Sequence, residues 1–459
     1  MLSNTYRLKY LFGIYLLETQ NNLDIIQKKS VTLRFIETTY KYNNLLKTNN
    51  KIISEAVYNY HRMANGIGIV YKATRSMVAH SGVFINVGSR DEDKHNEGIA
   101  HFIEHAIFKG TTRRKAYHIL NRIDGVGGEL NAYTTKEETC VYASALDKHL
   151  NRCLELFADI LFNSTFPEKE IEKEREVILD EINSYKDTPS ELIFDEFEEQ
   201  FFGTHSLAHN ILGNAKNIRK TTGKHLSSFI KQNYTTDKMV ISVVSNTPFE
   251  KVVAMCEKHF GHIAPHTTAG QRTAPNQYIQ FEIEKNKHIH QAHALIGCPA
   301  YNTHSDKKVA FSLLNNILGG PALNSRLNMG IREKYGLCYN IESQYNPMSD
   351  TGIFYIYAAM DADFKERINE LIAHEINRLK TQKLSPTQLN AAKQQLIGQV
   401  AINAESALSE MQSMGKAFMT FGKVDTIEEI NNDILQVTAN QIIEAANEVW
   451  HDFSRLVFF

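Results

Sequence analysis

Cysteine is scarce in this 459-residue chain, and no two cysteines stand close together. The five that are present form an odd set without any C-x-x-C pair: Cys140, Cys153, Cys256, Cys298 and Cys338. Small secreted proteins use paired cysteines as disulfides, and many structural zinc sites use closely spaced ones. The pattern therefore favours free buried thiols in a reducing compartment over a disulfide framework or a cysteine-bound zinc.

Long apolar runs and a charge excess are also absent. No apolar run approaches the roughly 20 residues that a membrane-spanning helix needs. The 50 Lys and Arg residues nearly balance the 52 Asp and Glu residues, and the formal net charge is -2. This balance gives no electrostatic reason to bind nucleic acid or an anionic membrane. We expect neither partner, and we expect a cytoplasmic protein of bacterial type, or a mitochondrial matrix protein in a eukaryote, rather than a secreted or periplasmic one.

The first 55 residues show no regular pattern and are rich in Asn, Lys and Tyr. The apolar stretch "YLFGIYLL" (10–17) follows Arg7 and Lys9, but the small-residue cleavage site of a secretory signal peptide does not follow it. We expect an N-terminal extension of undefined order over residues 1–55, outside the main fold, and assign it no function.

Regular patterns begin near residue 57. Alternating apolar residues predict strands in "GIGIVYKA" (66–73) and "SGVFINVGS" (81–89), and a helical period follows in "NEGIAHFIEHAIFKG" (96–110). The β-rich run "GGELNAYTTKEETCVYASAL" comes next, then a helix over about 150–162 and a helix behind Pro167. Strands mixed with long helices indicate an α+β fold, with helices packed on one face of a mostly antiparallel sheet.

The pattern repeats after a linker rich in Pro, Thr and Gly (264–277). With a constant offset of 210, "VAFSLLNNILGG" aligns with "IAHFIEHAIFKG" and pairs Gly320 with Gly110. The chain is therefore predicted to contain two duplicated halves, 56–263 and 278–459. The second half has apolar or neutral residues where the first has ionisable ones: Phe311 for His101, Leu314 for Glu104, and Asn315 for His105.

His101, Glu104 and His105 stand out because the duplicated helix folds without them. On a helix the three side chains lie along one side, since residues three and four apart are neighbours. Two imidazoles one turn apart can hold a zinc ion, and a carboxylate beside them can take a proton from water on the metal. H-x-x-E-H is a known zinc-peptidase pattern, although a chain of this length contains it by chance in roughly one case in twenty.

A zinc site needs a third protein ligand, and the helix behind Pro167 offers two carboxylates. A buried carboxylate needs a cation or strong donors, because burying it unpaired costs several kcal/mol at least. An arginine or a lysine could satisfy each one, but two of them downstream of H-x-x-E-H shift the balance towards a metal. The predicted buried stripe of this helix contains Ile171, Glu174, Ile178, Glu181, Ile182 and Tyr185.

Several motifs occur in a characteristic order. "HFIEH" is followed by "GGELNAYTTKEETCVY", then by Glu181 after 75 intervening residues, and finally by "SRLNMGIREKYGLCYNIES". The 75 residues are those between "HFIEH" and Glu181. In this order the motifs resemble the pitrilysin/insulinase family of zinc peptidases, over about residues 57–459. The length resembles the shorter branch of that family, the mitochondrial processing peptidase type and its bacterial relatives.

The resemblance implies a zinc endopeptidase that cleaves peptides or unfolded polypeptide segments, with one zinc ion per chain. His101, His105 and Glu181 would be the zinc ligands. Glu104 would be the base that activates a zinc-bound water for attack on the scissile carbonyl, and Glu174 would orient a ligand.

The resemblance also implies residues that bind the substrate. Gly128, Asn131 and Ala132 would belong to an edge strand that aligns the substrate backbone by β-strand addition. Arg332 and Tyr339 match the C-terminal pair that holds the substrate and stabilises the developing oxyanion, and both side chains are hydrogen-bond donors.

The resemblance assigns a part to each half. Residues 56–263 would be the zinc-binding peptidase domain, and residues 278–459 a homologous domain without metal ligands that carries the Arg/Tyr pair. Some family members divide the zinc motif and the pair between two subunits, whereas this chain holds both. We therefore expect a self-sufficient subunit, and a homodimer that closes around a peptide.

Two other functions compete with a peptidase. A non-catalytic core or partner subunit, as the family contains in respiratory complexes, loses metal ligands, whereas all four residues of the predicted site are present here. A regulatory peptide-binding protein with a structural zinc would hold the metal through four protein ligands, without an adjacent free glutamate.

Overall fold

The structure, a computed structural model, describes residues 58–267 and 272–459. The N-terminal extension predicted over residues 1–55 lies outside the described residues. Within the described ranges, no helix is both long enough and apolar enough to cross a membrane. All five cysteines are free and buried, as their spacing predicted.

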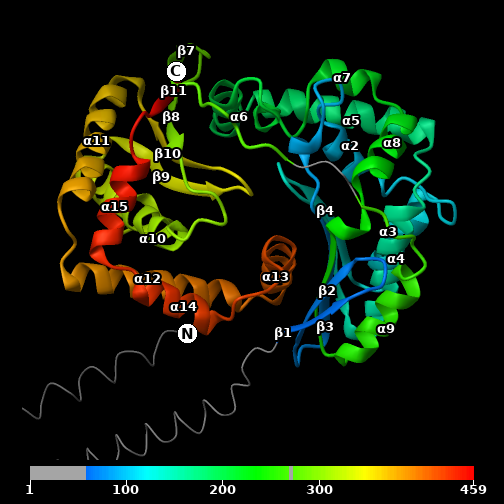
Figure 1. The fold of residues 1–459 in the computed structure, drawn as a ribbon. Helices are drawn as coiled ribbons and strands as arrows, with labels where there is room; N and C mark the ends of the chain where they lie inside the picture. The colour runs from blue at the N-terminus through cyan, green and yellow to red at the C-terminus, as the bar shows by residue number, and fades with distance from the viewer. Residues whose placement is uncertain (1–57, 268–271) are drawn as a thin grey trace, which may run out of the picture. The chain divides into compact units, whose positions relative to one another are not determined.

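The first half is built on a six-stranded sheet with the order β1-β2-β6-β3-β5-β4 (Figure 1). Strands β2 and β6 are parallel, and the other neighbours are antiparallel. Strand β6, "MVISVVS", is buried at every position, as expected of a central strand that is covered on both faces. The strands are β1 (Tyr58–Arg62), β2 (Gly68–Ala73), β3 (Val78–Ile85), β4 (Glu129–Thr134), β5 (Thr139–Leu146) and β6 (Met239–Ser245).

Helices cover one face of this sheet and enclose the core of the first half. The helix predicted over 150–162 is confirmed as α4, whose apolar face is buried against β3 and β5. The remaining α-helices are α2 (Ile99–Ala106), α3 (Ala116–Asp124), α5 (Glu168–Lys186), α6 (Pro189–Phe202), α7 (Ala215–Lys220), α8 (Gly223–Asn233) and α9 (Phe249–Phe260). Short 3-10 turns are η1 (Ser89–Asp91), η2 (Asp147–His149), η3 (Ser206–Ala208) and η4 (Thr236–Lys238).

The second half repeats this plan with five strands in the order β7-β11-β8-β10-β9. Its strands are β7 (Glu282–Lys285), β8 (Ala292–Pro299), β9 (Cys338–Pro347), β10 (Gly352–Met360) and β11 (Ser454–Phe458). Its helices are α10 (Lys308–Gly319), the π-helical η5 (Asn328–Glu333), η6 (Ala362–Phe364), α11 (Lys365–Thr381), α12 (Pro386–Ala404), α13 (Ala407–Phe421), α14 (Ile427–Gln436) and α15 (Ala439–Val449).

Apart from the additional strand β1, the two sheets have the same topology. In each, a parallel pair (β2 with β6, β7 with β11) is followed by three antiparallel neighbours that end in an edge strand, β4 or β9. Helix α2 follows β3 as helix α10 follows β8. The predicted fold class, two duplicated halves each with a mostly antiparallel sheet, is confirmed.

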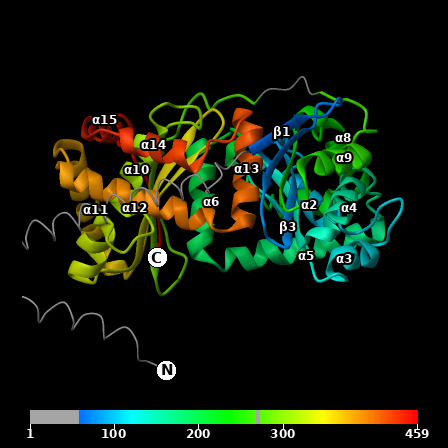
Figure 2. The ribbon, with the colours of Figure 1, turned by 90° about the horizontal axis from the view of Figure 1, so that it is seen from below.

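Each half also covers the second face of the other half's sheet with one helix. Helix α13 packs on β2, β3 and β6 of the first half, and helix α6 packs on β8 and β11 of the second (Figures 1 and 2). Met411, Met414 and Phe418 of α13 meet Val70 and Phe84 in one apolar cluster. The sequence predicts helices on one face only, because the packed elements are about 90 or more positions apart in the chain. The α6 cluster contains Ile193, Phe197, Phe201, Leu295, Ile353, Tyr355 and Leu456.

Candidate metal centre

Helix α2 presents the H-x-x-E-H residues because both its start and its apolar side are fixed. Gly98 caps the helix at φ 88°, a left-handed conformation that glycine adopts without strain. The apolar residues of α2 are buried in the core of the first half. Its other side, which carries His101, Glu104 and His105, packs towards α5 and β4.

The structure brings the three predicted metal ligands together. Ligand atoms of His101, His105 and Glu181 all lie within 4.8 Å of one another, and they are the one such group in the described part of the chain. Nε2 of each histidine is 3.8 Å from Oε2 of Glu181. This separation is too long for a hydrogen bond. Ligand atoms about 2.1 Å from a tetrahedral zinc ion are about 3.4 Å apart, so the donor set fits a small metal ion.

The exposure of Glu181 contradicts the prediction that it belongs to a buried stripe. Its side chain is 44% exposed, whereas Glu174 and Ile178 on the same helix are buried. The prediction was wrong because Glu181 lies at the edge of the covered side of α5, whereas the next residue, Ile182, is buried. An exposed third ligand leaves the metal position accessible, as a catalytic site requires.

Glu174 is buried and doubly paired. Its Oε2 lies 3.2 Å from Nδ1 of His105, and its Oε1 lies 2.7 Å from Nζ of Lys109. A carboxylate on Nδ1 leaves Nε2 of His105 free for a metal. Burial alone would raise the pKa of Glu174, but the bonds to His105 and Lys109 lower it below its usual value. Glu174 therefore pairs with a lysine, as the simpler prediction has it, and also contacts His105, one of the predicted metal ligands.

The two histidines differ in their electrostatic surroundings. Burial, together with the neighbouring His105, lowers the pKa of His101 to about 4. His101 is therefore neutral near pH 7, which is the form that binds a metal. Burial would also lower the pKa of His105, but its bond to Glu174 and the charges of Glu181 and Glu104 raise it.

Glu104 lies between the metal group and the edge strand β4. Burial raises the pKa of its carboxyl group, while Thr134 of β4 and His105 act in the opposite direction. Its position on α2, three residues from His101 and next to His105, places a proton acceptor beside the metal position.

Strand β4 is the free edge that the resemblance implies. It stands last in the sheet, and Asn131 and Ala132 pair with Tyr142 and Val141 of β5 on its inner side. The outer side can accept a further strand. Gly128, just before β4, has a packing role: a Cβ atom there would lie 2.7 Å from Ile123 and 2.8 Å from the Ser144 carbonyl.

Arg332 and Tyr339 lie apart from this group. Arg332 donates to Asn328 and Glu333, and the hydroxyl of Tyr339, which is 61% exposed, donates to Asp361. No hydrogen bond or ion pair among the described residues joins the pair to α2, α5 or β4.

Strand geometry gives the scale of this separation. Tyr339 is at the start of β9, and Ser349, just beyond its end, contacts Glu137 of the first half. Ten strand residues span roughly 30 Å. Among the described residues, the zinc group and the Arg/Tyr pair therefore share no polar contact, and most of strand β9 lies between Tyr339 and the contact of Ser349 with the first half.

Three residues near the site were not predicted from the sequence. Lys109 holds Glu174, Glu92 binds the start of α2, and Arg90 binds the turn after β4. The signal for Lys109 was its position, one turn after His105 on the same side of the helix. Arg90 and Glu92 belong to the charged run "SRDEDK", where the sequence pattern cannot separate buried from solvated charges.

Two family models match consecutive parts of the chain, and the boundary between them falls within the first half, at α7. The family model described as "Insulinase (Peptidase family M16)" matches residues 69–215, and that described as "Peptidase M16 inactive domain" matches residues 220–396. An uncharacterized zinc protease of Bacillus subtilis, YmxG, is 33% identical over 389 residues, which are 84% of this chain and 94% of that protein. The chain belongs to the insulinase family, M16.

Further relatives and solved structures are similar to this chain over most of its length. An uncharacterized zinc protease of Rickettsia felis is 34% identical over 399 residues, 86% of this chain and 95% of that protein. A protease from Helicobacter pylori has a similar solved structure, with a TM-score of 0.81 at 21% identity, covering 88% of this chain and all of that one. An M16 inactive-domain structure from Pseudomonas fluorescens gives a TM-score of 0.80 at 20% identity and covers 87% of this chain and 98% of that one. These structures show that the fold of the insulinase family is retained.

Proposed function

We propose that this protein is a zinc endopeptidase that cleaves peptides or unfolded polypeptide segments, in the manner of a processing peptidase. The observation that carries the proposal is the convergence of two histidines from α2 and one glutamate from α5, with Glu104 beside them. The relatives named zinc proteases support the same activity. A structural zinc would use a fourth protein ligand in place of an accessible position.

Each residue has a chemical part in this proposal. His101, His105 and Glu181 would hold one zinc ion, which when bound supplies a Lewis acid that polarises a carbonyl and acidifies a water. Glu104 takes the proton of the attacking water and returns it to the leaving amine. A peptide adds as a strand along the free edge of β4, so that its scissile bond lies beside Glu104.

Replacing Glu104 with Gln tests the mechanism directly. The variant should bind zinc and peptide as the wild type does, because Gln keeps the shape, but cleavage should fall by about two to four orders of magnitude, since the base is lost. Cleavage of a fluorogenic peptide and metal content by atomic spectroscopy measure the two properties separately. Full cleavage by this variant would refute the proposed base. A folded wild-type protein without zinc would favour the non-catalytic subunit instead.

We further propose that a second copy of the chain supplies Arg332 and Tyr339 to the zinc group. The roughly 30 Å of strand between Tyr339 and the contact with the first half supports this arrangement. A homodimer closing around the substrate would then contain two complete sites. Each site would combine the zinc group and Glu104 of one copy with Arg332 and Tyr339 of the other. The guanidinium and the phenol would donate hydrogen bonds to the carbonyl oxygen of the substrate as that oxygen becomes negatively charged.

Mixed dimers test the shared site. A dimer of one Glu104→Gln chain and one Arg332→Ala chain should have one intact site and about half of the wild-type activity, although each homodimer is inactive. Differently tagged chains, co-expressed and purified through both tags, provide this species for a peptide-cleavage assay. If both groups acted within one chain, the mixed dimer would be as inactive as its parents.

A further inference from the structure

The short turn η1 and the residue after it carry three charged side chains in succession: Arg90, Asp91 and Glu92. Successive residues of a 3-10 helix point about 120° apart, because the helix has three residues per turn. The three side chains can therefore reach three different elements, although they are neighbours in the chain.

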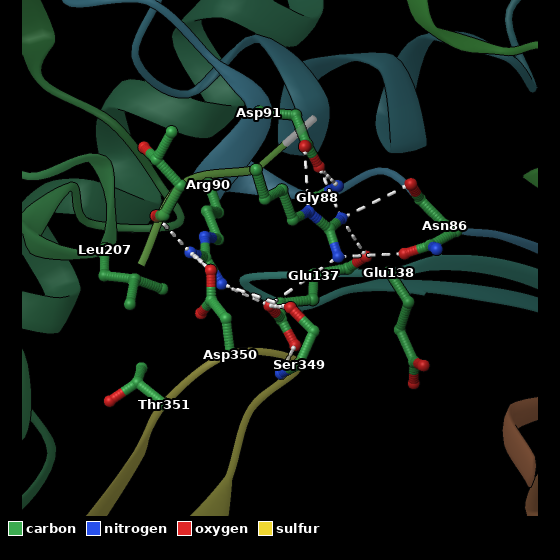
Figure 3. Close-up of polar contacts among 12 residues, drawn as sticks. Asn86, Gly88, Arg90, Asp91, Glu137, Glu138, Leu207, Ser349, Asp350 and Thr351 are labelled. Carbon is green, nitrogen blue, oxygen red and sulfur yellow. Dashed lines mark hydrogen bonds and ion pairs between the residues drawn. The ribbon is translucent and has the colours of Figure 1, made fainter. Parts of the chain in front are cut away.

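Arg90 joins the turn after β4 to the second half. Its guanidinium is only 1% exposed and donates to Oε1 of Glu137 and Oδ2 of Asp350, both at 2.5 Å (Figure 3). It also donates to the carbonyl of Thr273 at 2.8 Å and to Oγ of Ser349 at 3.3 Å. Glu137 stands three residues after β4, and Ser349 and Asp350 form the turn between β9 and β10. Since a buried guanidinium with two carboxylates is costly to leave unpaired, this contact holds both turns firmly.

Asp91 binds Arg272, in the segment that connects the halves. Its two carboxylate oxygens accept from Nε and Nη2 of Arg272 at 2.9 and 2.7 Å, a paired geometry. Arg272 also donates to the carbonyl of Glu137 at 2.7 Å and to Oδ1 of Asn86 at 2.9 Å. The connecting segment is therefore anchored at the same turn after β4.

Glu92 binds the start of the metal helix. It is 5% exposed, and its two oxygens accept from the backbone N–H groups of Gly98 and Ala100, each at 2.8 Å. These N–H groups have no partner within α2, and a carboxylate there also meets the positive end of the helix. Ala100 directly precedes His101, so Glu92 fixes the backbone next to a metal ligand.

The backbone of the turn adds two direct bonds to the β4–β5 turn. Ser89 N–H donates to the Thr135 carbonyl at 3.1 Å, and Arg90 N–H donates to the Lys136 carbonyl at 2.8 Å. Gly88 permits this approach, because a Cβ atom there would lie 2.3 Å from the Thr135 oxygen.

We infer that Arg90, Asp91 and Glu92 form a positioning junction that sets the metal helix α2 and the substrate strand β4 relative to each other and to the second half. The inference rests on the proposed peptidase function and adds positioning residues to it. Arg90 acts on the substrate strand through Glu137, and Glu92 acts on the metal group through the first turn of α2. Loss of the contact at Glu137 should therefore weaken peptide binding and leave zinc affinity intact. Loss of the contact at Glu92 should weaken zinc binding and leave peptide binding intact.

Three single substitutions that conserve side-chain shape test the two links in the full-length, zinc-loaded protein. Glu137→Gln and Asp350→Asn should each raise the KM for a peptide substrate about tenfold, with zinc affinity unchanged, because they loosen the turn after β4. Glu92→Gln should weaken zinc about fivefold, the effect of a lost helix cap, with KM unchanged. Zinc affinity is measured by competition with a chelating dye, and KM by initial rates at saturating zinc.

The control is Glu370→Gln, which removes an exposed ion pair with Arg367 on α11. It should change neither KM nor zinc affinity. A parallel loss of zinc affinity, KM and melting temperature in all three junction variants would show general destabilisation and overturn the inference, as would wild-type values in all three. If the wild type binds zinc but cleaves nothing, the peptidase function fails. The junction is then tested by the zinc affinities and by the dissociation constant of a fluorescent peptide in place of KM.

Discussion

The three proposed metal ligands differ in how firmly the protein holds them. His101 is 7% exposed, and His105 is fixed through Glu174 and Lys109, whereas the side chain of Glu181 is 44% exposed. One carboxylate oxygen of Glu181, Oε2, lies 3.8 Å from Nε2 of both histidines, with no shorter polar contact among the described residues. Its negative charge is thus free to bind a cation, while the two histidines are fixed before the cation arrives.

Substitution of Glu181 by Gln should lower zinc affinity on the order of tenfold or more, since a charged ligand is replaced by a neutral one. Protein stability without zinc should be unchanged, because the side chain is exposed. Glu176→Gln, at another exposed position on α5, is the matched control. Chelator competition measures the affinity and thermal unfolding of the zinc-free protein measures the stability. Equal zinc affinities of the two variants would contradict the assignment of the third ligand.

The sequence predicted the residues that chemistry restricts most. H-x-x-E-H and the two carboxylates of α5 could be predicted because few other roles explain ionisable groups on an apolar helix. The exposure of Glu181 and the position of Arg332 could not be predicted, because both depend on the tertiary packing around their elements and not on the local sequence pattern. The role of Arg90 could not be predicted either, since its side-chain partners are 47 to 260 residues away. Glu92 binds N–H groups only six and eight residues away, but nothing in the charged run distinguishes it from its solvated neighbours.

Helix α13 belongs to the second half but covers one face of the first half's sheet. Glu410 accepts from Tyr58 and Lys72, each at 2.7 Å, and the Met411 carbonyl accepts from Ser242 at 2.7 Å. Gly415 allows the helix to lie close to the sheet, because a Cβ atom there would be 2.2 Å from the ring of Phe84. No local sequence feature requires a glycine in the middle of this helix. The close contact with Phe84 explains why residue 415 is a glycine.

Gly415→Ala should therefore destabilise the protein by about 1–3 kcal/mol, the usual cost of overpacking, although alanine favours a helix. Gly398→Ala on α12 is the matched control, because no atom lies within 4 Å of its added Cβ. That variant should stabilise the protein by up to about 1 kcal/mol. Urea unfolding measures both, and a shift of the same sign in the two variants would contradict the close packing of α13.

The whole described chain is held together by more than its connecting segment. Helices α6 and α13 are exchanged between the halves, and Arg90 and Arg272 bind both sides of the junction. These contacts oppose movement of one half against the other. We therefore expect closure around a substrate to occur between two copies of the chain rather than within one.

A chain that is cut between residues 267 and 272 should remain one particle. A protease site inserted there should, after cleavage, leave two fragments that elute together in gel filtration and keep the zinc affinity of the intact protein, since the apolar clusters around α6 and α13 remain buried. Separation of the fragments in dilute buffer would show that the covalent connection is required. Adding Gly415→Ala to the cut protein should promote that separation.

The exchange of α13 also affects how the chain folds as it is made. The sheet of the first half is complete once β6 ends at Ser245, but the helix that covers its second face ends only at Phe421. At about 5–20 residues per second, a ribosome needs roughly 10 to 35 seconds to synthesise the intervening residues. During that time Val70, Phe84 and Val244, all buried in the finished protein, face solvent on the nascent chain. Newly made first halves are therefore expected to bind chaperones until α13 emerges.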